Sequence, residues 1–350
     1  MTTVNYLDAM YPVFGESVRR IALGNFPTPV RQIGIRTAGK SQYVSIKYDN
    51  LSANVYGGNK VRKLEYLLAP RTRHRVRRFA TFGTVGSNHA LATAIYAKQL
   101  GFECTCFLAH QAKVETIAPA LIMHASLGTE IVRYGGPYRS RLKTLRQNLW
   151  DRDAWVVPAG GSSWIGTLGF VNAGLELAAQ VDAGEIPPPA RIYVATGTMG
   201  TAAGLALGLA IAGLRAEVQA VRVSATDICN DEGLIRLIRK TATMMHQLDS
   251  SVPPDLANRV RIRIRHSFFA GGYAHSDPSI ENAVHLADEQ LGLTLESTYT
   301  GKAMAALLSD IKQNDSVDEC LFWNTYNSVP LTPVDSFDAS AIPAEFRCYL

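Results

Sequence analysis

The 350-residue sequence lacks any apolar stretch long enough to cross a bilayer, and its first residues lack the basic and apolar regions of a secretion signal. The longest apolar run, residues 202–214, is interrupted by glycines and predicts a buried helix. No internal repeat or low-complexity block is present. We therefore expect a cytoplasmic protein with no membrane partner.

Cysteine is also scarce. The five cysteines are scattered, their number is odd, and none forms the CxxC spacing of a metal site. Cys104 and Cys106 alternate within the strand-like run 102–108. This pattern predicts reduced, buried thiols, with neither a disulfide framework nor a bound metal.

The excess of positive charge is small, with a net charge of +5. Basic residues concentrate in the run 71–78 and in a set of arginines that alternates with apolar residues over 259–265, which predicts a strand with one arginine-rich face. Neither run has interleaved aromatic residues. We expect solvated surface or a subunit contact here, and no nucleic-acid partner.

Short apolar runs alternate with helical patterns along the whole chain, which is typical of an α/β fold with parallel sheets. A chain of this length usually divides its core between two lobes. The prolines at 187–189 predict a surface linker before a strand that begins at Arg191. The expected strands include 43–46, 155–157, 192–195 and 321–323, and the expected helices include 63–68, 90–100, 167–180 and 201–212.

Four turns rich in glycine and small residues precede helices, at 57–60, 83–88, 160–163 and 196–201. Ligands of open α/β sheets bind at the carboxyl ends of strands, where such turns lie. The turn at 196–201 follows a strand and opens a helix, so its free N–H groups could bind a compact phosphate monoester. It is neither a Walker A motif nor a dinucleotide fingerprint, and a purely structural turn is the alternative.

Lys60 follows Gly57, Gly58 and Asn59 and precedes an amphipathic helix. A lysine at the mouth of a cleft loses solvation, which lowers its pKa and suits it to form a Schiff base. Lys63, one turn further, is interpreted as a solvated helix residue.

The run Gly-Gly-Asn-Lys-Val-Arg-Lys-Leu-Glu-Tyr at 57–66 resembles the cofactor-lysine motif of the aminocyclopropanecarboxylate deaminase and D-cysteine desulfhydrase family. The resemblance extends from about Phe26 to about Leu308. It implies a fold-type-II pyridoxal 5'-phosphate enzyme, similar to the tryptophan synthase β subunit, with two lobes that each have a twisted, mostly parallel sheet flanked by helices. We expect residues 1–60 and 169–350 to form the larger, cofactor-binding lobe and residues 61–168 the smaller one, in a homodimer.

The resemblance also implies roles for individual residues. Lys60 would bind the cofactor and act as the catalytic base, and Ser87, Tyr299 and Tyr273 would act near the substrate. Asn88 would contact the ring oxygen of the cofactor, and Thr300 would face its ring nitrogen. The phosphate would be bound by Gly197, Thr198, Met199, Gly200 and Thr201.

Thr300 stands where the deaminases have glutamate, and a hydroxyl leaves the ring nitrogen largely neutral. That favours a lyase that acts on a small amino acid by α-proton removal and β-elimination, like D-cysteine desulfhydrase, over an aminocyclopropanecarboxylate deaminase. Two departures from the family motifs leave the substrate open: Gly86 in place of glutamine, which we expect to enlarge the pocket, and the segment 324–327. The alternatives are a β-replacement enzyme of a specialised biosynthetic pathway, an aminocyclopropanecarboxylate deaminase, and a binding protein without turnover.

Overall fold

The computed structural model describes residues 4–37, 39–69, 76–136, 138–148, 153–313, 319–331, 337 and 339–350. The chain divides into two compact units, one formed by residues 1–66 and 162–329 and the other by 67–161 and 330–350. These divisions differ from the expected lobe boundaries. Residues 330–350 belong to the smaller unit, because Phe346 and Tyr349 near the C-terminus pack against His110.

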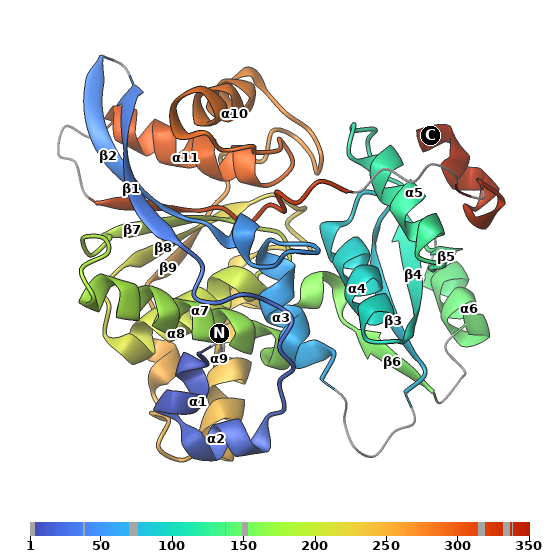
Figure 1. The fold of residues 1–350 in the computed structure, drawn as a ribbon, viewed down its shortest axis with the longest axis horizontal. Helices are drawn as coiled ribbons and strands as arrows, with labels where there is room; N and C mark the ends of the chain where they lie inside the picture. Colours follow the sequence, from blue (N-terminus) through green and yellow to red (C-terminus); the bar gives the residue numbers. More distant parts are fainter. Residues whose placement is uncertain are drawn as a thin grey trace. The chain divides into compact units, whose positions relative to one another are not determined.

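The first unit contains a six-stranded sheet in which only the pairing of β1 with β2 is antiparallel. The last strand in sequence, β10, lies between β2 and β7, so both of its partner strands come from much earlier in the chain (Figure 1). The strand order is β1 (Val30–Thr37), β2 (Lys40–Lys47), β10 (Cys320–Trp323), β7 (Arg191–Thr196), β8 (Glu217–Arg222) and β9 (Ile262–Arg265).

Helices cover both faces of this sheet, so successive side chains of β7 enter two different hydrophobic clusters. Ile192 and Val194 belong to one hydrophobic cluster, whereas Tyr193 and Ala195 belong to the other, as expected because successive strand residues point to opposite faces. The helices are α1 (Tyr6–Met10), α2 (Pro12–Ser17), α3 (Asn59–Leu67), α7 (Trp164–Asp182), α8 (Gly200–Ala212), α9 (Asp231–Leu248), α10 (Pro278–Leu291) and α11 (Thr300–Gln313).

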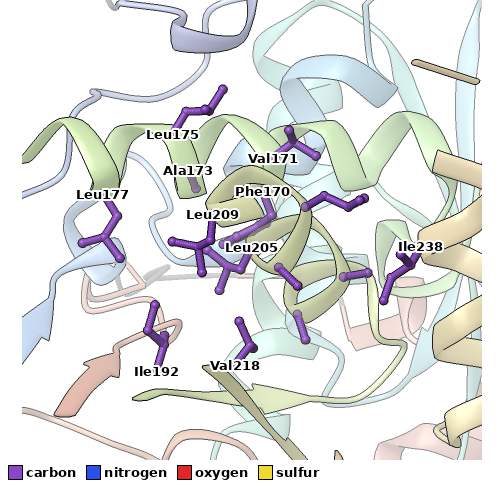
Figure 2. Packing of buried hydrophobic residues seen from close by; sticks show 14 of the residues in the cluster. Phe170, Val171, Ala173, Leu175, Leu177, Ile192, Leu205, Leu209, Val218 and Ile238 are labelled. Atoms are coloured by element: carbon purple, nitrogen blue, oxygen red, sulfur yellow. The ribbon is translucent and has the colours of Figure 1, made fainter. Parts of the chain in front are cut away.

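The first cluster is centred on α7 and α8, whose apolar side chains meet those of β7 and β8 (Figure 2). The two helices approach closely at Gly208, where an added Cβ would lie 2.2 Å from the carbonyl oxygen of Val171. The expected helix over 202–214 is therefore confirmed as far as Ala212, it is buried as far as Leu209, and its glycines allow the close packing. Among the described residues, no helix is long and apolar enough to cross a membrane.

The second unit contains a fully parallel four-stranded sheet. Its strand order is β5 (Glu130–Arg133), β4 (Glu103–Ala109), β3 (Arg78–Thr84) and β6 (Ala154–Val157). Its helices are α4 (Asn88–Gln99), α5 (Ile117–Ser126), α6 (Tyr138–Asn148) and the short C-terminal η5 (Ala344–Tyr349). The strand–helix alternation predicted from the sequence is confirmed in both units.

The arginine-rich strand is shorter than predicted, because only residues 262–265 are extended. Its arginines pair with carboxylates of their own unit: Arg259 with Asp255, Arg263 with Glu217, and Arg265 with Asp310. Most of the other basic run, residues 71–75, lies outside the described residues.

All five cysteines have free thiols, and four of them are buried, as predicted. Cys104 and Cys106 lie on one face of β4 with their sulfur atoms 3.8 Å apart. No group of three or more His, Cys, Asp or Glu side chains within the described ranges is arranged to hold a metal ion.

Candidate functional site

Lys60 is the second residue of α3 and follows a turn that only glycine can form. Gly58 has a φ of +85°, in the left-handed region. A Cβ on Gly57 would lie 2.2 Å from the carbonyl oxygen of Asn50, and one on Gly58 would lie 2.7 Å from that of Thr325. The paired glycines therefore fix where the lysine enters the helix.

The segment 324–327 holds this turn in place. The backbone N–H of Asn59 donates to the carbonyl oxygen of Thr325 at 3.1 Å, and the N–H of Gly57 donates to Oδ1 of Asn327 at 2.7 Å. The departure from the family motif at 324–327 thus lies against the lysine turn.

The Lys60 amine is prepared for nucleophilic chemistry. Burial lowers its pKa to about 8, and the carboxylate of Glu296 acts in the opposite direction. A larger fraction of the amine is therefore neutral near pH 7 than in an ordinary lysine. A neutral amine is the form that can attack a carbonyl or accept a proton.

The N-terminus of α8 forms an anion cradle. Met199 before the helix has a φ of +68° and makes no capping hydrogen bond through its side chain. The Ser162 hydroxyl lies 2.7 Å from that of Thr198 and accepts the Gly200 N–H at 3.1 Å. Asn59, beside Lys60, donates to the hydroxyl of Thr201 at 3.1 Å. Small hydroxylated residues and a helix N-terminus therefore meet next to α3.

The interpretation of Lys63 as a solvated helix residue is wrong. Its side chain is 2% exposed, and Nζ lies 3.5 Å from the hydroxyl of Ser162. An added Cβ on Gly200 would lie 3.1 Å from this Nζ. Burial and the neighbouring Lys60 lower the pKa of Lys63. The spacing of the two lysines could have indicated this burial, because Lys63 lies almost one helical turn after Lys60, on the same side of α3.

Together, these groups fit a phosphate monoester. Lys63 places an amine at the start of α8, and a negative charge there would raise its lowered pKa and relieve the cost of its burial. Any side chain at position 200 would fill the space between Lys63 and Ser162. The sequence prediction had included Gly197 to Thr201 but neither Lys63 nor Ser162.

Glu296 organises the start of α11. Its carboxylate accepts the backbone N–H groups of Thr298, Tyr299 and Thr300 at 2.8 to 3.1 Å. The fully buried Thr300 hydroxyl donates to the same carboxylate at 3.1 Å. Burial raises the pKa of Glu296, although these hydrogen bonds act in the opposite direction. The Thr300 hydroxyl, which was expected to face the ring nitrogen of the cofactor, is therefore also hydrogen-bonded to the Glu296 carboxylate.

Tyr273 and Tyr299 lie together, with their hydroxyl oxygens 2.5 Å apart. Burial, followed by the neighbouring Tyr273, raises the pKa of Tyr299, so this hydroxyl keeps its proton at neutral pH. The loop that carries Tyr273 is held by Lys302 of α11, which donates to the carbonyl oxygens of Phe269 and Gly272 at 2.8 and 2.9 Å.

In the second unit, Ser87 is the N-cap of α4 and accepts the N–H of Ala90 at 3.2 Å. Asn88 is the first residue of that helix. The buried His89 lies 3.0 Å from the Thr81 hydroxyl, in agreement with a structural role for this histidine. The structure thus brings Ser87 and Asn88 to the same turn.

The expectation that Gly86 enlarges a pocket is wrong. A Cβ on Gly86 would lie 2.9 Å from Nε2 of Gln111 and 3.1 Å from Cγ1 of Ile117. The Gln111 side chain therefore occupies the space beside the glycine.

A buried network of ion pairs anchors α3 through its residue Arg62. Arg62, two residues after Lys60, contacts Asp49 and Glu176, each at 2.8 Å. Lys47 contacts the same Glu176, and all four side chains are at most 1% exposed. These bonds fix the orientation of the helix that carries both lysines.

Comparison with known proteins agrees with this geometry. The family model described as "Pyridoxal-phosphate dependent enzyme" matches residues 21–323. Nocardicin C-9' epimerase of Nocardia uniformis subsp. tsuyamanensis is 30% identical over 88% of this chain and 92% of the relative. D-cysteine desulfhydrase of Salmonella schwarzengrund is 29% identical over 86% of this chain and 90% of the relative.

Solved structures show the same fold. A crystal structure of an ACC deaminase homologue has a TM-score of 0.74 at 24% identity, covering 93% of this chain and 95% of the other. A pyridoxal 5'-phosphate-dependent aspartate racemase has a TM-score of 0.62 at 16% identity, covering 94% and 96%. The expected fold class, fold type II, and the expected cofactor are both confirmed. The chain belongs to the pyridoxal-phosphate dependent enzymes, within the aminocyclopropanecarboxylate deaminase and D-cysteine desulfhydrase family.

Proposed function

We propose that this enzyme removes the α-proton of a small amino acid and expels its β-substituent, as in conversion of D-cysteine to hydrogen sulfide, pyruvate and ammonia. The observation that carries the proposal is Lys60, a lysine with a lowered pKa at the start of α3. When bound, pyridoxal phosphate accepts the electron pair left on Cα, which makes the α-proton removable. In this proposal, Lys60 binds the cofactor and, once released, accepts the α-proton at Nζ.

The tyrosine pair supplies the acid. Tyr299 carries its hydroxyl proton at neutral pH, as an ordinary tyrosine does, and Tyr273 is 2.5 Å away to replace that proton once it is given up. A proton given from Tyr299 Oη to the leaving sulfur makes a better leaving group than a bare sulfide. Lys302 positions Tyr273 through the carbonyls of its loop. Ser87 and Asn88 take the substrate-side and ring-oxygen roles that the resemblance implies.

The cofactor phosphate would be bound by Gly197 to Thr201, with Lys63 and Ser162 completing the cradle. The ring nitrogen would meet the Thr300 hydroxyl, which would turn its proton from Glu296 to that neutral nitrogen. A threonine at this position, rather than a carboxylate, favours elimination over cyclopropane opening.

The test is product analysis of the purified enzyme with D- and L-cysteine. We expect sulfide and pyruvate in equal amounts from one enantiomer, and slower turnover when its α-hydrogen is deuterium. In heavy water, α-deuterium exchange with inversion and without sulfide would instead indicate epimerisation, the activity in the name of one relative. That outcome would contradict elimination but not α-proton removal by Lys60.

β-Replacement, in which an added thiol or amine captures the intermediate product, has less support. It rests on room made by Gly86 together with the altered segment 324–327, and the Gln111 side chain occupies the space beside Gly86. Addition of thiols during turnover should leave the pyruvate yield unchanged. A fall in pyruvate matched by a new thioether would favour replacement.

Replacing Lys63 by methionine is expected to weaken retention of the cofactor by at least about tenfold, because charge-assisted hydrogen bonds contribute about 1.5–3 kcal/mol. Equilibrium dialysis of pyridoxal phosphate against the apoenzyme measures this. Lys98→Met, at an exposed position on α4, is the matched control and should bind normally. Unchanged retention by Lys63→Met would contradict the phosphate role.

We also propose that the enzyme acts as a homodimer in the cytoplasm. Light scattering of the purified protein tests the assembly. A mass of 38.1 kDa, that of one chain, would contradict it.

A further inference from the structure

Gly86 and Ser87 belong to a tight turn at the end of β3. The Ser87 N–H donates to the carbonyl oxygen of Thr84 at 2.9 Å, which closes the turn, and Val85 continues the pairing with β4 through the carbonyl of Ala109. The remaining backbone N–H of the turn, that of Gly86, donates to Oε1 of Gln111 at 3.1 Å. A side chain from the loop after β4 therefore completes the hydrogen bonds of the turn that presents Ser87.

Gln111 is itself held by the C-terminal end of the chain. The Tyr349 hydroxyl donates to the Gln111 carbonyl at 2.9 Å and accepts the Gln111 N–H at 3.3 Å. The same hydroxyl lies 3.1 Å from Nδ1 of His110. The backbone N–H and C=O of Gln111 are thus both hydrogen-bonded to one phenol, and only 8% of Tyr349 is exposed.

The rest of the C-terminal segment docks on the same loop. The ring of the fully buried Phe346 packs edge-on against His110, with ring centroids 4.9 Å apart. The carbonyl oxygen of Cys348 accepts a hydrogen bond from Lys113 at 3.3 Å. A continuous chain of contacts therefore runs from the last residues through Gln111 to the Ser87 turn.

We propose that Gln111 is a positioning residue for Ser87, and that the C-terminal segment sets its position through Tyr349. Gly86 has no side chain, and the Gln111 side chain lies in the space beside it. The Gln111 amide oxygen holds the turn by accepting the Gly86 N–H. This inference rests on the proposed role of Ser87 at the substrate. It predicts that Tyr349 influences substrate binding through Gln111.

Two variants test the proposal in the full-length holoenzyme. Gln111→Leu removes the amide at similar volume, and Tyr349→Phe removes only the hydroxyl. Since one hydrogen bond contributes about 1 kcal/mol, we expect KM to rise about fivefold in each, with kcat and bound cofactor changed less than about twofold. Lys113→Ala, which removes a contact of the same segment without touching Gln111, is the matched control.

The second readout needs no substrate. Hydrogen exchange of the Gly86 amide should quicken several-fold in Gln111→Leu, because its acceptor is lost, and to a smaller extent in Tyr349→Phe. Gln111→Asn, whose amide is too short to reach, should behave like Gln111→Leu. Unchanged exchange at Gly86 would overturn the inference even if the proposed reaction fails. If exchange of the Gly86 amide quickens but KM for a substrate that the enzyme converts is unchanged, Gln111 only supports the turn. That result would also overturn the inference.

Discussion

Replacement of Lys60 by alanine is expected to lower turnover by roughly 10⁴-fold or more, because it removes both the attachment point of the cofactor and the proposed base. The visible absorbance band of lysine-bound cofactor should disappear as well. Lys60→Arg is the matched control for charge, since guanidinium stays protonated and cannot replace the amine. Full turnover by Lys60→Ala, with the band retained, would contradict the assignment.

The lowered pKa of Lys60 adds a pH dependence to the same experiment. Loading of the apoenzyme requires the neutral amine, so its rate should rise with pH and level off above about 8, the pKa that burial imposes. With an ordinary lysine, the rise would continue to about pH 10. Stopped-flow measurement of cofactor binding between pH 6 and 10 separates the two.

Replacement of Glu176 by alanine is expected to lower the free energy of unfolding by about 3–5 kcal/mol, because it leaves the buried Lys47 without its carboxylate partner and Arg62 with Asp49 alone. Urea titration measures the change. Glu232→Ala, which breaks an exposed pair with Arg236, is the matched control and should cost less than about 1 kcal/mol. Equal losses in the two variants would show that the network contributes nothing beyond a surface pair.

The acid range gives a second measurement of the same carboxylate. Burial raises the pKa of Glu176, but Arg62 and Lys47 outweigh it and lower the pKa to about 2. A carboxylate whose folded pKa is depressed contributes stability above its ordinary pKa, near 4.5, and loses it as the pH falls towards 2. Burial lowers the pKa of Lys47 despite its contact with Glu176. Glu176→Gln should therefore show a flatter loss of stability between pH 4.5 and 2.

The sequence allowed prediction of those features that depend on local pattern. Strand–helix alternation predicted the parallel sheets, and Gly57-Gly58 predicted a constrained turn before Lys60. The turn that opens α8 was likewise predicted from its own small residues. Each depends on neighbours along the chain, so a single sequence carries the information.

Long-range contacts were beyond prediction. Lys63 resembles any helix lysine until α8 packs beside it, and Gln111 lies 25 residues from the glycine whose space it fills. Glu296 was not singled out, because only the folded start of α11 brings its carboxylate to Thr300. The identities of these residues are compatible with exposed loop or helix positions, and only tertiary packing gives them their contacts.

The position of β10 has a consequence for synthesis of the protein. This strand lies between β2 and β7, and the residues just after it hold the turn before Lys60. A nascent chain therefore cannot complete the larger sheet, or fix its catalytic lysine, until residue 327 has left the ribosome. Shorter nascent chains, which lack β10, would leave the edges of β2 and β7 open to incorrect pairing. Assembly of the cofactor site thus has to wait for synthesis of residues 320–327.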